Sequence, residues 1–336
     1  MKLNPLLYSA VITALVITSC SNDSTTTDGK DSTTTSGTTS EEETYENLPI
    51  PAFNEDSAYS FIEKQVSFGP RVPNLKAHKE CGDYLVAKLK SYGANVIEQR
   101  AEATTWDGVK LDMRNIIAQF NPEERKRVLL CAHWDSRPRA DEDSEEQDMP
   151  ILGANDGASG VGVLLEVARH LQASLPYVGV DIIFFDAEDW GVSRAGSDTY
   201  CLGSQYWSRN THVPAYTARF GILLDMVGAK DAIFAWEGYS LQFAPGIAKK
   251  VWNAAAGLGY SNYFQKIERG GILDDHYFVN VEAGVPTIDI IQYDPATDSK
   301  FGAYWHTHDD DMDVISKPTL KAVGQTLLKV VYSEKP

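Results

Sequence analysis

Apolar residues recur with two different periods along the chain from about Leu48 onward. In several long stretches they fall three or four positions apart, which is the spacing of one helix face. These stretches are residues 54–70, 77–93, 157–175, 240–259 and 317–335. The first helix is expected to be capped near Asp56 or Ser57 and to stop at Gly69 and Pro70.

Shorter runs rich in β-branched and other apolar residues predict strands. They cover residues 114–120, 127–133, 180–187, 220–228 and 286–294. Because strands alternate with helices over most of the chain, we expect a three-layer α/β/α sandwich with a mixed, largely parallel central sheet. The order of the strands within that sheet does not follow from the pattern.

The segment before Leu48 is expected to serve targeting and not folding. Its apolar stretch, 6–17, is too short to span a bilayer as a mature helix and leads into the letters ITSC, which resemble a bacterial lipobox. Residues 1–19 are therefore expected to be a lipoprotein signal peptide, and Cys20 the lipidated residue. An ordinary secretory signal cut nearby is the alternative.

Residues 20–47 are rich in Ser, Thr and Asp and predict a disordered tether, whereas residues 48–336 predict a single α/β domain. This layout implies a location in the cell envelope. Ser21 directly after the anchor suits the periplasmic face of the outer membrane.

The formal net charge of −17 argues against nucleic acid and anionic membrane surfaces as partners. The acids gather in runs at 41–46, 141–148 and 309–313, which are typical of solvated surface. The remaining cysteines have neither a disulfide framework nor zinc-finger spacing, so buried free thiols are expected. They are Cys81, Cys131 and Cys201.

Polar residues cluster where the predicted strands end, which is the ligand-binding edge of open α/β sheets. Taken singly each is weak evidence, and Asp156 before a helix would usually be an N-cap. Together they form the His and carboxylate set that zinc prefers, and the absence of cysteine favours a catalytic site over a structural one. The set is His133, Asp135, Asp156, Glu188, Asp189, Asp225, Asp274, Asp275, His276, His306 and His308.

The order of these motifs resembles the zinc exopeptidase superfamily, which includes aminopeptidases and glutaminyl cyclases. In the aminopeptidases an HxD motif, a single Asp, a Glu-Glu pair, another Asp and a late His form two metal sites. By this resemblance the pattern falls on His133, Asp156, Glu188-Asp189, Asp225 and His306. The second acid of the pair is Asp189 here, which is one methylene shorter.

The finer resemblance is to the glutaminyl cyclases of the animal type, and it covers most of residues 57–333. It rests on the letters FGPRVPN at 68–74, DDHYF at 274–278, YWHT at 304–307 and LLDMVGA at 223–229. The animal enzymes bridge two cysteines near the first motif. Cys131 lies close to one of them but lacks the partner, so that bridge is not expected.

The cyclase resemblance implies one zinc ion held by Asp156, Asp189 and His306, with a fourth position open. Glu188 is expected to move the proton, and Asp274 to orient the amine or stabilise the leaving group. Trp190 and Trp305 are candidate pocket walls, although Trp190 taken alone is typical of a core residue. The expected polar surroundings are His133, Asp135, Asp225, Asp275 and His276, of which the first three could instead complete a second metal site and the last two a helix cap.

The implied activity is cyclisation of an N-terminal glutamine to pyroglutamate with loss of ammonia. Expected partners are peptides or proteins that begin with glutamine, the chain being monomeric and touching the membrane only through its lipid. The acidic loop 141–148 could attract cationic peptide N-termini. The alternatives are a two-zinc aminopeptidase of the same fold and a tethered binding lipoprotein with a degenerate site.

Overall fold

The computed structural model describes residues 45–336, so the predicted signal peptide, Cys20 and most of the tether lie outside the described residues. Within 45–336 no helix combines the length and apolar content that a membrane span needs. Tyr45 already packs edge-on against Tyr177, with ring centroids 5.5 Å apart.

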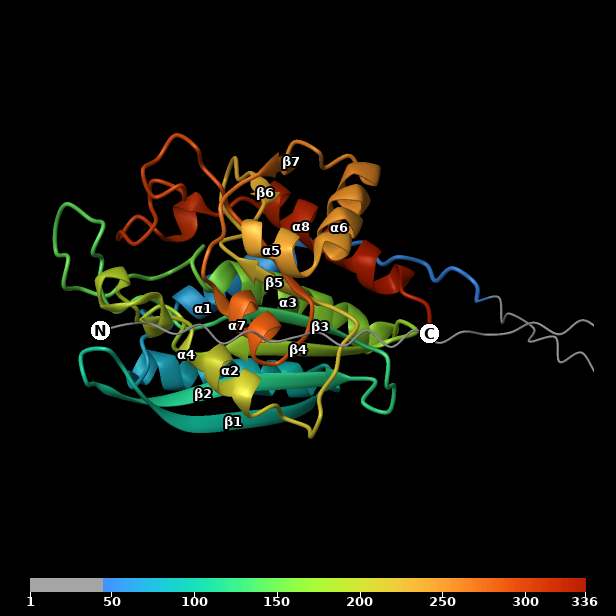
Figure 1. The fold of residues 1–336 in the computed structure, drawn as a ribbon, viewed down its shortest axis with the longest axis horizontal. Coiled ribbons are helices and arrows are strands. Elements are labelled where there is room, and N and C mark those ends of the chain that lie inside the picture. The colour runs from blue at the N-terminus through green and yellow to red at the C-terminus, as the bar shows by residue number, and fades with distance from the viewer. Residues whose placement is uncertain (1–44) are drawn as a thin grey trace, which may run out of the picture. The chain divides into compact units, whose positions relative to one another are not determined.

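A six-stranded sheet with the order β1-β2-β4-β3-β5-β8 forms the centre of the fold (Figure 1). β1 pairs antiparallel with β2 and β2 antiparallel with β4, whereas β3, β4, β5 and β8 run parallel. The strands are β1 Asn95–Thr104, β2 Lys110–Phe120, β3 Arg127–His133, β4 Gly179–Phe185, β5 Gly221–Asp225 and β8 Thr287–Ile291. A small parallel pair, β6 Phe234–Trp236 and β7 Phe264–Glu268, lies outside this sheet.

Helices cover both faces of the sheet, which confirms the expected three-layer sandwich. They are α1 Glu55–Val66, α2 Lys76–Ser91, α3 Ala158–Ala173, α4 Leu202–Arg209, α5 Gly238–Phe243, α6 Pro245–Gly257, α7 Asp275–Val281 and α8 Lys317–Ser333. Short 3₁₀ turns are η1 Ser193–Ala195, η2 Ser197–Thr199 and η3 Met312–Val314.

Alternate residues of each central strand face opposite layers, as the period of two in a strand requires. On β4, Ile182 and Phe184 belong to the larger apolar cluster shared with α1, α2, α3, α6 and α8. Ile183 and Phe185 belong to the smaller cluster, which includes Trp207 of α4 and Val279 of α7. The central strands are therefore buried on both sides, which explains their continuous apolar runs.

Two predicted helices differ from the structure in detail. The cap of α1 is Asn54, whose side chain accepts the backbone N–H of Ser57, so the caps expected at Asp56 or Ser57 are wrong. The single helix expected over 240–259 is two helices that meet at Ala244. Pro245 causes this break, because the residue before a proline avoids helical geometry and proline itself suits a helix start.

The carboxyl ends of the parallel strands meet at one edge of the sheet. His133 at the end of β3 pairs in register with Phe185 at the end of β4, and Asp225 ends β5 beside Ile291 of β8. The polar segments that follow these strands are thereby brought together, although they are up to about half the chain apart in sequence.

Candidate active site

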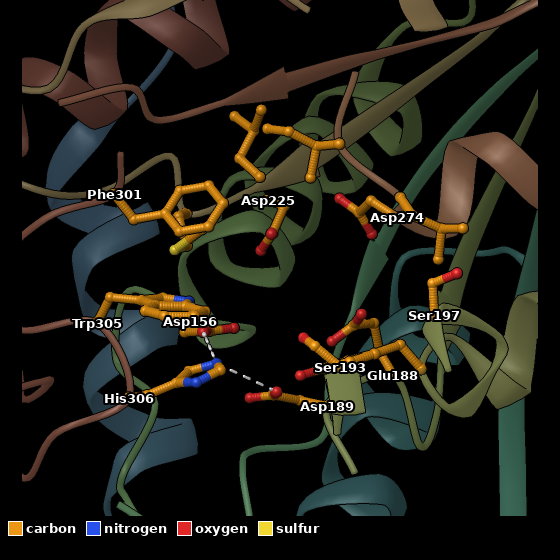
Figure 2. Close-up of a pocket in the computed structure, with 15 residues that line it drawn as sticks. Asp156, Glu188, Asp189, Ser193, Ser197, Asp225, Asp274, Phe301, Trp305 and His306 are labelled. Atoms are coloured by element: carbon orange, nitrogen blue, oxygen red, sulfur yellow. Dashed lines mark ion pairs between the residues drawn. The ribbon is translucent and has the colours of Figure 1, made fainter. Parts of the chain in front are cut away.

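A pocket of about 260 Å³ opens at this edge of the sheet (Figure 2). Its polar lining includes Asp156, Glu188, Asp189, Asp225, Asp274 and His306, and its apolar lining Met226, Ile272, Leu273, Ile291, Phe301 and Trp305. In Figure 2 Asp156 and Asp189 point toward His306, while Glu188 and Asp274 lie across the pocket. The expected acids and His306 therefore share one cavity.

Asp156, Asp189 and His306 form a buried group whose donor atoms all lie within 4.8 Å of one another. His306 Nε2 lies 3.4 Å from Asp189 Oδ1 and 3.8 Å from Asp156 Oδ2. Tetrahedral ligands about 2.0–2.2 Å from zinc are separated by about 3.3–3.6 Å, so the 3.4 Å separation lies within this range and the 3.8 Å separation slightly beyond it. Asp189 Oδ2 is buried without a hydrogen-bond partner among the described residues, which leaves it free to coordinate.

The loop before α3 is shaped to turn the Asp156 carboxylate into the pocket. The backbone N–H of Asp156 donates to Asp310 Oδ2, and the N–H of the neighbouring Asn155 donates to Asp310 Oδ1. The cap position of α3 is Gly157 at φ +93°, where an added Cβ would lie 2.5 Å from the Asp135 carbonyl oxygen. Asp156 is thus not the N-cap of this helix, and its side chain faces the histidines instead.

The Glu188-Asp189 pair follows β4 through a tight turn at Ala187, which has φ +54°. Asp135 at the end of β3 accepts the backbone N–H groups of both acids, at 3.1 and 3.2 Å. This carboxylate therefore fixes the turn on which a metal ligand and a proton carrier stand side by side.

A buried arginine that the sequence reasoning missed connects two of the candidate ligands. Arg137 donates to Asp189 Oδ1 at 2.7 Å and forms a bidentate ion pair with Asp141, both bonds being 2.6 Å. Asp141 Oδ1 in turn lies 3.5 Å from His306 Nδ1. Although burial opposes it, His306 and Arg137 hold the pKa of Asp189 below its ordinary value.

The acidic loop is part of this support and not only solvated surface. Glu142 N–H donates to the His306 carbonyl oxygen, and Asp143 accepts from His308 at 2.9 Å. His306 itself has φ +58°, a left-handed conformation that costs a non-glycine residue about 1–3 kcal/mol. Contacts from the loop therefore hold a strained backbone in place at a candidate metal ligand.

His133, Asp156 and Asp225 form a second group with donor atoms within 4.8 Å of one another. His133 Nε2 lies 3.0 Å from Asp156 Oδ1 and 3.2 Å from Asp225 Oδ1. These separations are those of hydrogen bonds and ion pairs, shorter than the spacing expected of two zinc ligands. His133 is thus paired with both carboxylates of this group.

Glu188 and Asp274 occupy the side of the pocket away from His306. Burial, together with the charges of Asp189 and Asp274, raises the pKa of Glu188 well above its ordinary value. Burial and the charge of Asp225 raise the pKa of Asp274 to about 6. Both groups can therefore bind a proton more readily than ordinary carboxylates.

The two residues after Asp274 differ: His276 has a side-chain partner, whereas both carboxylate oxygens of Asp275 are buried without a hydrogen-bond partner among the described residues. Asp274 itself is the N-cap of α7 and accepts the N–H of Asp275, so the cap role weighed for Asp275 and His276 falls on Asp274. His276 is fully buried and lies 3.0 Å from Glu237 Oε2.

Of the expected walls, Trp305 lines the pocket and stacks on His306, with ring centroids 3.5 Å apart. Trp190 is not among the residues that line the pocket in the described part of the chain, which corrects the expected wall. Its ring packs with Leu111 and Met113, and its Nε1 donates to Asp107. Phe301, which the sequence reasoning missed, contributes the further aromatic surface.

Comparison with known proteins gives matches over most of the described chain. The model of peptidase family M28 matches residues 115–331. The solved glutaminyl cyclase of Bacteroides thetaiotaomicron bound to N-acetylhistamine is 53% identical, with a TM-score of 0.84, over 85% of this chain and 100% of that chain. A solved leucine aminopeptidase precursor from Bacteroides thetaiotaomicron VPI-5482 is 52% identical, with a TM-score of 0.83, over 86% and 100%.

Among curated proteins, the glutaminyl-peptide cyclotransferase of Gloydius blomhoffii is 27% identical over 247 residues. This match covers 63% of the chain and 63% of the relative. The chain therefore spans somewhat less than two thirds of the length of this curated relative.

Proposed function

The chain belongs to peptidase family M28, and from this membership and its site we propose that it cyclises the N-terminal glutamine of peptides and proteins to pyroglutamate. The expected resemblance to zinc exopeptidases is confirmed at the level of the family. The observation that carries the proposal is the 53% identity, over the whole of that chain, to a solved bacterial glutaminyl cyclase.

The family implies zinc, and the residues present fit it. Asp156, Asp189 and His306 would hold the ion, which when bound supplies a Lewis acid for the side-chain amide oxygen of the substrate. We propose one catalytic ion, in this group, because its separations of 3.4 and 3.8 Å are wider than the 3.0 and 3.2 Å of the His133 group. In the His133 group, the ring nitrogen Nε2 is already hydrogen-bonded to Asp225 and ion-paired with Asp156.

Glu188 is the group placed to move the proton. In the reaction the α-amine of glutamine forms a bond to its own side-chain amide carbon, the carbon–nitrogen bond of the amide breaks, and ammonia leaves. The amine gives up a proton and the leaving nitrogen gains one, so one carboxylate can carry it between them. Glu188 lines the pocket directly beside the metal ligand Asp189.

The other residues of the pocket orient the substrate and limit the access of water. Asp274 lies across from His306, where its carboxylate can accept from the substrate amine. Trp305, Phe301 and Ile291 add apolar surface, which suits a reaction that consumes no water. The pocket, with a volume of about 260 Å³, has room for one folded-back glutamine residue.

A zinc aminopeptidase is the second candidate, and one specific observation favours it. The solved structure named as a leucine aminopeptidase precursor is nearly as similar to this chain as the cyclase. As an aminopeptidase, this chain would deliver water to the first peptide bond of the substrate. For that reaction the group of His133, Asp156 and Asp225 would have to hold a second ion.

The reaction product distinguishes the glutaminyl cyclase activity from the aminopeptidase activity. We expect a synthetic peptide that begins with glutamine to lose one ammonia, keep its length and acquire a blocked N-terminus, as followed by mass spectrometry. Matched peptides that begin with leucine or alanine serve as controls and should remain intact. Release of free N-terminal amino acids without ammonia would establish the aminopeptidase instead.

A further inference from the structure

A cysteine lies against the proposed proton carrier. Cys201, the residue that precedes α4, donates from Sγ to Glu188 Oε1 at 3.2 Å, and its backbone N–H donates to the Glu188 carbonyl oxygen. Cys201 is completely buried, and its backbone has φ +58°. Sγ, a Glu188 oxygen and an Asp274 oxygen all lie within 4.8 Å of one another.

Asp274 provides an independent sign that this group can take a ligand. The residue is 4% exposed, and its Oδ2 has no hydrogen-bond partner among the described residues. A buried carboxylate oxygen without a partner raises the free energy of the folded state, because it has lost its hydration and has no hydrogen bond to compensate. The Oδ1 atom is already used by the Asp275 N–H, so Oδ2 is the atom available for coordination.

We propose that Glu188, Cys201 and Asp274 form a second cation site that binds thiophilic divalent ions such as Zn²⁺ or Cd²⁺ and stops turnover. One sulfur and two carboxylate donors are an acceptable ligand set for these ions. On binding, the S–H bond of Cys201 breaks, a sulfur–metal bond forms, and the proton passes to solvent. Hard ions such as Mg²⁺ and Ca²⁺ prefer oxygen ligands only and are excluded.

The inhibitory effect rests on the proposed function, since Glu188 cannot carry a proton while its carboxylate is a ligand. The site differs chemically from the group of Asp156, Asp189 and His306, which contains no sulfur. A thiolate-to-metal charge-transfer band in the ultraviolet therefore reports on the Cys201 site even when both sites are filled.

The test titrates Cd²⁺ into the zinc-loaded full chain carrying Cys20→Ser, which removes the N-terminal thiol. We expect a cadmium–thiolate band that saturates at one Cd²⁺ per chain. The band should be absent in Cys201→Ser and retained in the control Cys131→Ser, whose thiol is buried elsewhere. Asp274→Asn, which keeps the shape of the side chain, should weaken the band and covers the case in which Cys201→Ser fails to fold.

Turnover is followed in the same samples. Cadmium should lower pyroglutamate formation by about 100-fold or more in the parent and leave the remaining activity of Cys201→Ser unaffected at the same concentration. A missing band, or equal inhibition of the parent and Cys201→Ser, overturns the second site. A band together with no pyroglutamate formation in the zinc-loaded control without cadmium supports the site and contradicts the proposed function instead.

Discussion

The surroundings in this pocket shift the pKa values of the adjacent carboxyl groups Glu188 and Asp189 in opposite directions. Asp189 faces Arg137 and His306, whose positive charges favour its ionised form, whereas Glu188 faces further acids and a thiol. A permanently charged group suits a metal ligand, and a group that binds protons suits a proton carrier. The structure therefore supports different roles for neighbours that a sequence motif presents as a pair.

Glu188→Gln is expected to retain zinc and to lower kcat by about 10²–10⁴-fold, because it removes the proton carrier and preserves the size of the side chain. His306→Ala should lose zinc and activity together, since it deletes a ligand. Metal content by elemental analysis and steady-state kinetics on a glutamine peptide distinguish these outcomes. Full turnover by Glu188→Gln would exclude it as the proton carrier.

Asp141→Asn is expected to lower zinc affinity by about 10–100-fold, although Asp141 does not line the main pocket. The carboxylate joins Arg137 to His306 Nδ1, and carboxylates behind ligating histidines fix the orientation of the ring. The parent should hold about one zinc per chain, and chelator competition measures the loss. Asp148→Asn on the same loop is the matched control, and equal effects in both would contradict the orienting role.

The sequence allowed Asp156, Glu188, Asp189 and His306 to be predicted as one set, because each follows a recognisable motif at a strand end. It did not indicate Asp141, since an acid within the run 141–148 has the pattern of solvated surface. Asp141 pairs locally with the buried Arg137, four residues earlier. Its contact with His306 Nδ1 arises only when the loop packs against the segment around His306. The contact of Cys201 with Glu188 was hidden because it depends on how the chain folds between two residues 13 positions apart.

At the level of elements, the buried helices and strands were predicted well and the exposed or short ones were not. β3 and β4 are buried throughout, so their apolar runs are unmistakable. β1 is an edge strand whose residues alternate between exposed and half-buried, and its polar sequence NVIEQRAEAT gave no clear signal. α4 and α7 have 8 and 7 residues, too few for a helical period to be recognised.

The packing of α3 against the sheet depends on a small residue. A Cβ added to Gly160 would lie 2.3 Å from the Leu224 carbonyl oxygen and 2.9 Å from Ala132 Cβ, so the helix would have to move away. We expect Gly160→Ala to destabilise the protein by about 1–3 kcal/mol in denaturant titrations. Gly246→Ala in α6, where nothing lies within 4 Å, should be neutral or stabilising. A neutral Gly160→Ala would contradict the close approach.

For the whole molecule, the sheet explains how a site assembles from distant segments. Four parallel strands end at one edge, so that acids following β3, β4 and β5 converge with the His306 segment near the end of the chain. The net charge of −17 is carried outside this site as well as within it. A formal net charge of −17 over the whole chain disfavours electrostatic attachment to an anionic membrane surface, so a membrane attachment would need another means.

We propose that the attachment comes from Cys20, which lies outside the described residues. It follows the letters ITS after an apolar stretch and precedes the polar segment 21–47, the order expected of a lipid anchor and its tether. The parent expressed in a double-membraned bacterium should fractionate with the outer membrane, as Ser21 suggests. Cys20→Ala should appear in the soluble fraction with its zinc content and activity unchanged, because the anchor takes no part in the chemistry. If Cys20→Ala still sediments with membranes, attachment does not depend on this cysteine and the proposed location is wrong.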